Sequence, residues 1–138
     1  MITISGFVVT LYSLIGLGLA AQGLRYLIAS QFMHYHQDVI RERWGDLQPG
    51  ERRLMLGLLK GFGAGMFCLG LTIVFVALGP VRDHVYRAHL FIAVLTVAYT
   101  SLLVHITRFA LLPKAAPIEV TMTMLAMSLA ASIGALAF

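Results

Sequence analysis

The chain has 138 residues, of which 59% are hydrophobic and only 12% are charged, and its formal net charge is +4 at pH 7. Soluble domains carry about 25% charged residues, so this composition excludes an ordinary soluble domain and is typical of a membrane protein. The bases are spread over connections beside apolar stretches, which argues against a nucleic-acid partner. One cysteine, Cys68, excludes an intramolecular disulfide.

Four apolar stretches are each long enough for the roughly 20 residues that a helix needs to cross the hydrocarbon core. The first has no basic residue before Arg25, so we expect a retained helix rather than a cleaved signal peptide. The four stretches leave no room for a separate soluble domain. We therefore expect one all-α domain over residues 1–138, an integral membrane four-helix bundle with spans at about 2–28, 54–79, 86–112 and 117–138.

The connection after the first span has helical periodicity. Over residues 31–44, apolar and polar side chains separate onto two faces, which predicts a short interfacial amphipathic helix. Pro49 and Glu51 are typical of the first turn of the next helix. His34 and His36 would point in nearly opposite directions on a helix, so we expect no metal site there.

Small residues recur every four positions in three of the predicted spans. In membranes, such faces let the backbone of another helix approach closely. The partner is either another helix of the same bundle or another membrane protein, including a second copy. The residues expected to pack in this way are Gly16 and Ala20, then Gly57, Gly61 and Gly65, and finally Ala126, Ala130 and Gly134.

Basic residues concentrate around the first and third connections. The positive-inside rule predicts that these connections are cytoplasmic and that both termini lie outside the cytoplasm. Arg25, Lys60, His105 and Arg108 lie on the predicted cytoplasmic side of their spans. They are interpreted either as snorkelling side chains or as a binding site for an anionic group such as a lipid headgroup. Glu119 is a further candidate, as an ion-pair partner of one of these bases.

The sequence contains no paired carboxylates and no nucleophile beside a base, so we expect no catalysis. His89 and His105 are 16 residues apart on one predicted helix, or about 24 Å, too far to share a haem iron. We expect a protein without cofactor or metal that acts through helix packing, as an accessory or assembly subunit of a larger bacterial membrane complex. The alternatives are a binder or transporter of a small molecule or anionic lipid, and a redox anchor for haem or quinone.

The order "GLRYL…FMHYH…WGDLQPGERRLMLGLLKGFGAG", Gly23 to Gly65, resembles a group of small bacterial inner-membrane proteins with four spans. The resemblance covers the first two spans and their connection. It implies a multi-pass protein of the bacterial inner membrane, and it implies no activity, because none is assigned to that group.

Overall fold

The computed structural model describes residues 4–32, 37, 43–83, 85–110 and 117–135. These residues form four α-helices and no strand, so the all-helical prediction is confirmed for the described part of the chain. The helices are α1 (Ile4–Ile28), α3 (Pro49–Val76), α4 (Tyr86–Ala110) and α5 (Pro117–Ala135), and α3 continues into a π-helical turn, η1 (Ala77–Val81).

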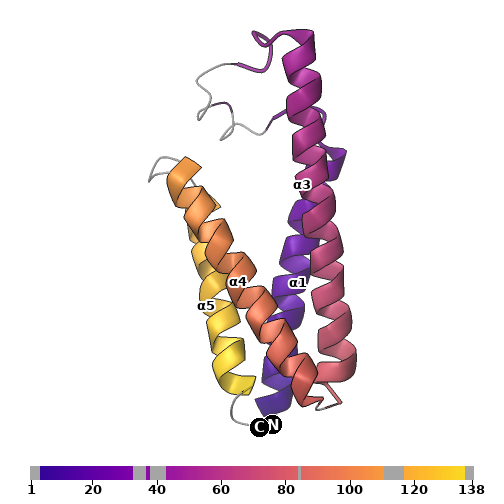
Figure 1. Ribbon diagram of the computed structural model, residues 1–138, viewed down its shortest axis with the longest axis vertical. Coiled ribbons are helices and arrows are strands. Elements are labelled where there is room, and N and C mark those ends of the chain that lie inside the picture. The colour runs from indigo at the N-terminus through magenta and orange to yellow at the C-terminus, as the bar shows by residue number, and fades with distance from the viewer. Residues whose placement is uncertain (1–3, 33–36, 38–42, 84, 111–116, 136–138) are drawn as a thin grey trace.

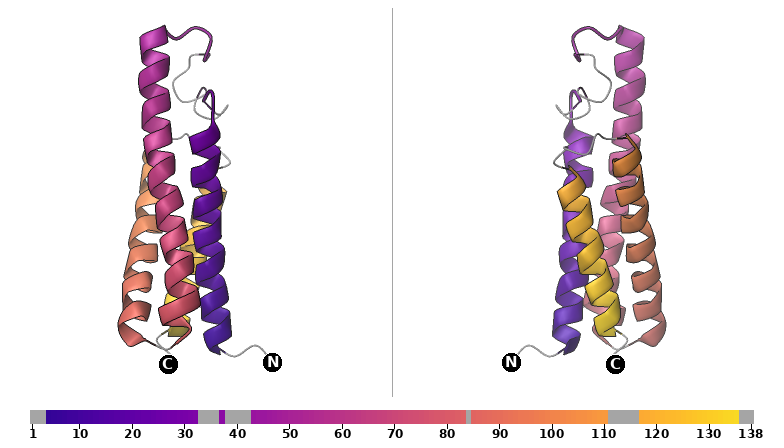
Figure 2. Two further views of the ribbon diagram at one scale, coloured as in Figure 1. Left: turned by 90° about the vertical axis from the view of Figure 1, so that its right-hand side faces the viewer. Right: turned by 90° about the vertical axis from the view of Figure 1, so that its left-hand side faces the viewer.

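The helices form two antiparallel hairpins. α1 packs along α3, α4 packs along α5, and α1 also contacts α5, whereas α3 and α4 have little contact beyond the turn that joins them. The two hairpins lie close together at the end that carries η1 and diverge toward the other end (Figure 1). Seen from the sides, the helices run almost parallel to the long axis (Figure 2). The start of α1, the end of α5 and the α3–α4 turn therefore lie at the same end of the molecule.

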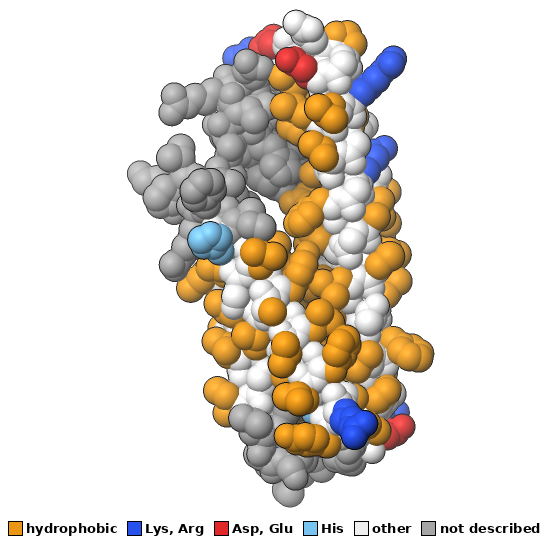
Figure 3. All heavy atoms as spheres, in the orientation of Figure 1, with side chains coloured by type: hydrophobic (Ala, Val, Ile, Leu, Met, Phe, Trp, Pro, Cys, Tyr) orange, Lys and Arg blue, Asp and Glu red, His pale blue; other side chains and the backbone are white. Residues whose placement is uncertain are grey.

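Three of the helices are long and apolar enough to cross a membrane, over Gly6–Ile28, Pro49–Val81 and Tyr86–His105. The apolar part of α5, Thr121–Gly134, is shorter than a full span among the residues described. The face drawn in Figure 3 is mostly apolar, and charged side chains gather toward its two ends. These features are those of a membrane protein, and a fourth crossing by α5 stays a prediction.

α3 begins at Pro49, where the sequence predicts a helix start. The apolar span was predicted from residue 54, so the helix extends five residues before it. The backbone N–H of Gln48 donates to Glu51 Oε2 at 2.9 Å, and Arg52 Nε donates to the carbonyl of the buried Leu47 at 2.8 Å. The first bond satisfies a backbone N–H that a helix start leaves unpaired. The second ties the end of the preceding connection to the first turn of the helix. Together with η1, α3 runs for 33 residues and extends beyond the other helices (Figure 1).

The predicted interfacial helix at 31–44 falls mostly outside the described residues, and His34 and His36 are among those not described. The described residues at its two ends, including Phe32 and Trp44, are not helical, so the predicted bounds are too wide. The ring centroids of Phe32 and Trp44 are 5.2 Å apart, whereas one continuous helix would separate these residues by about 18 Å. Phe32 and Trp44, near the two ends of this connection, are therefore in contact.

Candidate helix-packing site

Four glycines bring the backbones of α1 and α3 into contact. A Cβ atom added to Gly16 would lie 2.7 Å from the carbonyl oxygen of Gly70, and one added to Gly63 would lie 2.8 Å from that of Gly23. Real Cβ atoms do not approach backbone oxygens so closely, so no larger residue fits without moving the helices apart. The buried Ala20 lies beside Gly70 in the same interface. Gly16 and Ala20, which were predicted to pack against a helix, thus lie inside the bundle.

The two glycines on each of these helices are seven residues apart. Because α1 and α3 run in opposite directions, Gly16 meets Gly70 and Gly23 meets Gly63. A seven-residue repeat keeps the same face of a helix toward its neighbour when two helices cross at a small angle. Gly63 and Gly70 are not among the residues predicted to pack, because that prediction rests on four-residue spacings. The seven-residue spacing present in both helices is the signal that would have found them.

The glycines at four-residue spacing lie elsewhere on α3. Gly57, Gly61 and Gly65 are exposed, and a Cβ atom added to any of them would meet nothing within 4 Å. At about 100° per residue, they lie on the side of α3 roughly opposite to Gly63 and Gly70. The exposed Cys68 and Thr72 continue the same side. We call the surface formed by these five residues the open face of α3, because no helix of the described chain covers it.

The small residues of α5 divide in a similar way. A Cβ atom on Gly134 would lie 2.9 Å from Val8 Cγ2, so this glycine packs against α1. Ala126 and Ala130 are exposed, whereas Ser128 and Ala131 are small residues of α5 whose described side chains are buried. The predicted face of Ala126, Ala130 and Gly134 is therefore not a single interface within the described bundle.

A buried hydrogen bond joins α4 to α5. Thr100 Oγ1 and Ser128 Oγ are 3.1 Å apart, and both residues have no exposed surface. Each hydroxyl also lies within hydrogen-bond distance of a carbonyl oxygen of its own helix, Thr100 of Thr96 at 2.6 Å and Ser128 of Leu125 at 2.8 Å. Because a hydroxyl has one proton, one of the two donates across to the other, which accepts that bond and donates to its own carbonyl. Bonds of this kind hold neighbouring transmembrane helices together. The pair has its hydrogen bonds satisfied and is structural.

The predicted anion-binding residues do not form an enclosed site among the described side chains. Arg25, Lys60 and His105 are all exposed, and the side chain of Arg108 lies outside the described part. Arg25 and Lys60 lie at neighbouring levels of the α1–α3 hairpin, because Tyr26 packs against Gly63. His105 is on α4, which diverges from that hairpin toward this end (Figure 1).

The remaining ionisable candidates are also separate. Glu119 is exposed in the first turn of α5 and forms no ion pair with the described residues. His89 and His105 both lie on α4, the former buried and the latter exposed. Two histidines of one straight helix at this separation do not bind one iron.

Comparison with protein-family models, with curated proteins and with solved structures gives no match to this chain. The resemblance of residues 23–65 to small four-span membrane proteins stays an expectation.

Proposed function

We propose that the protein is a non-enzymatic membrane protein that acts through helix packing, as an accessory or assembly subunit of a larger membrane complex. In this proposal it crosses the bacterial inner membrane four times, with both termini outside the cytoplasm. The observation that supports the proposal is the open face of α3. It presents small residues to its surroundings, while the opposite face of the same helix already packs against α1.

The cost of glycine within a helix supports this interpretation. Each glycine in a helix interior is about 1 kcal/mol less favourable than alanine. At Gly63 and Gly70, the close approach of α1 accounts for that cost, because a Cβ atom would collide with its backbone. At Gly57, Gly61 and Gly65, nothing in the described chain offsets the cost. A partner helix that packs against their backbone would do so.

The dimensions of the open face also suit a helix. From Gly57 to Thr72 it is about 22 Å long, or four helical turns. Large exposed apolar side chains surround it: Leu54 and Phe75 lie in line with it beyond its two ends, and Leu58, Phe62 and Leu71 lie to its sides. Small residues let a second backbone come close and give van der Waals contact over a long stretch, which is how transmembrane helices associate.

The test is purification of the tagged protein from its native membranes in mild detergent, with Gly61→Leu and the triple variant Gly57→Leu, Gly61→Leu and Gly65→Leu. We expect a stoichiometric partner with the wild type and its loss in both variants. The replacements leave the fold intact, because these positions have open space around them. Helix content by circular dichroism checks this.

Ala98→Leu on α4 is the matched control, because Ala98 is also small, exposed and within a candidate span. It should keep the partner. Cys68, on the open face, reports on self-association: oxidation should crosslink two copies if the partner is the same chain. Retained assembly in the triple variant would count against the proposal.

A further inference from the structure

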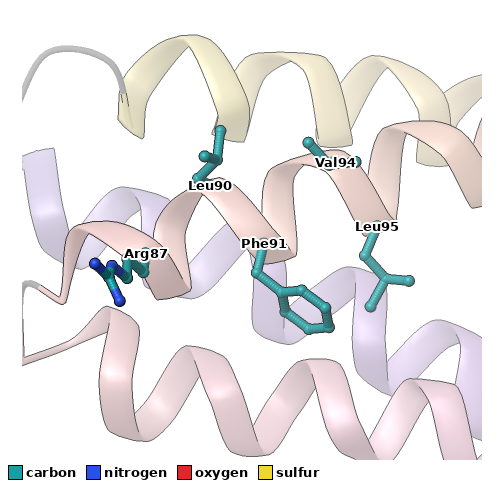
Figure 4. Close-up of a pocket in the computed structure, with 5 residues that line it drawn as sticks. All are labelled: Arg87, Leu90, Phe91, Val94 and Leu95. Carbon is teal, nitrogen blue, oxygen red and sulfur yellow. The ribbon is translucent and has the colours of Figure 1, made fainter.

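A second surface, on α4, has different chemistry. A groove of about 350 Å³ runs along this helix and is lined by Arg87, Leu90, Phe91, Val94 and Leu95. In Figure 4, Leu90 and Val94 point to one side of the helix and Phe91 and Leu95 to the other, with Arg87 at the end of the row. Among the described residues, the groove thus has apolar walls and one charged side chain, at one end.

The charged end of the groove lies where α4 begins. Arg87 is the second residue of the helix and is exposed, and the first turn contains no acidic residue. Arg87 forms no ion pair among the residues described. The positive partial charge of a helix N-terminus adds to that of the guanidinium. This end of the groove therefore attracts an anion.

The length of the groove matches one leaflet of a bilayer. Arg87 and Leu95 are separated by about 12 Å along the helix axis, and half of the hydrocarbon core is about 15 Å thick. α4 is one of the helices long and apolar enough to cross a membrane, and Arg87 lies at its end. A phospholipid with one acyl chain in the groove would therefore have its phosphate at the level of the guanidinium. Arg binds phosphate with paired N–H donors.

We propose that this groove binds an anionic phospholipid, with the phosphate at Arg87 and an acyl chain along Leu90, Phe91, Val94 and Leu95. A helix of another protein would match the apolar walls but would leave the guanidinium without an anion. The site is on a different helix from the open face of α3, and at the opposite end from the basic residues Arg25 and Lys60. It requires α4 to lie in the membrane but does not depend on a partner at α3.

The test uses tryptophan fluorescence in bilayers. Trp44 is the only tryptophan of the chain, so Trp44→Phe with Phe91→Trp leaves one reporter in the groove. The protein is reconstituted in phosphatidylcholine that contains increasing fractions of phosphatidylglycerol brominated on its acyl chains. Brominated phosphatidylcholine in unbrominated lipid gives the reference. We expect the anionic lipid to quench the reporter with about tenfold higher apparent affinity, the value of a charge-assisted hydrogen bond.

Arg87→Gln should remove this preference, whereas Arg82→Gln should keep it. Arg82 is the matched control, because it is exposed at the same end but does not line the groove. Equal loss in both variants would overturn the proposal and indicate a diffuse effect of charge. Equal quenching by both lipids in the reporter protein that retains Arg87 and Arg82 would also overturn it. Absence of quenching by either lipid would show that protein covers the groove, which is a third contradictory result.

Discussion

Glycine has two distinct environments on α3, although neighbouring glycines are only two residues apart. Gly63 lies against the backbone of α1, where an added Cβ atom would be 2.8 Å from the carbonyl oxygen of Gly23. Gly61 and Gly65 have open space. Of these three positions, only Gly63 requires glycine, because only there does α1 lie too close for a Cβ atom.

This difference predicts opposite effects of the same substitution. Gly63→Ala should destabilise the protein by about 1–3 kcal/mol, because the helices must move apart. Gly61→Ala in the isolated protein should stabilise it by roughly 0.5–1 kcal/mol, because alanine is the better helix former. Denaturant or thermal unfolding in detergent, followed by circular dichroism, measures both. Equal effects of the two variants would contradict the α1–α3 interface described above.

Side chains of its own first turn hold the start of α3 in place. Glu51 accepts from the Gln48 backbone, and Arg52 donates from Nε to the Leu47 carbonyl and from its terminal nitrogen to the Gly45 carbonyl. These contacts tie the end of the preceding connection to the first turn of the helix. They explain why the helix begins at Pro49 although its first turn is polar.

Arg52→Ala should therefore loosen this turn. The lost hydrogen bonds are worth about 1 kcal/mol, which corresponds to roughly fivefold faster amide exchange around residues 45–52. Hydrogen exchange with mass spectrometry measures this. Arg53→Ala is the control, since Arg53 is exposed and no hydrogen bond of its side chain is present in the described structure. Similar exchange in both variants would show that the Arg52 contacts do not hold the turn.

For the whole molecule, the two-hairpin arrangement fixes which connections share an end. The α3–α4 turn lies with the start of α1 and the end of α5, and the connection before α3 lies at the other end (Figure 1). A membrane crossed by α1, α3 and α4 would separate these two ends. The C-terminus lies on the same side of this membrane as the α3–α4 turn only if α5 also crosses it.

We predict that Asp83→Cys and a C-terminal tag are accessible from one side of the membrane and Asp46→Cys from the other. Both acidic residues are exposed, and Cys68→Ala removes the native thiol. A membrane-impermeant maleimide applied to intact and permeabilised cells or vesicles measures the sides. A C-terminal tag accessible on the side of Asp46 would show that α5 does not cross.

The sequence by itself determined the local features. The apolar stretches predicted α1, α3 and α4 to within a few residues, apart from the earlier start of α3. Pro49 and Glu51 predicted where that helix begins. Helix formation in apolar surroundings depends on hydrogen bonds within each segment, which is why these features can be read from consecutive residues. Periodicity in consecutive residues did not predict the contact between the rings of Phe32 and Trp44.

Only the tertiary structure decided which small residues pack inside. Gly63 and Gly70 meet α1, whereas the more regular series Gly57, Gly61 and Gly65 is left open. It also separated His105 from the hairpin that carries Arg25 and Lys60. In a soluble protein, polarity distinguishes the buried face of a helix from the exposed face. Lipid tails are as apolar as a protein core, so both faces of these helices are apolar, and the inward face is decided by the fit between helices.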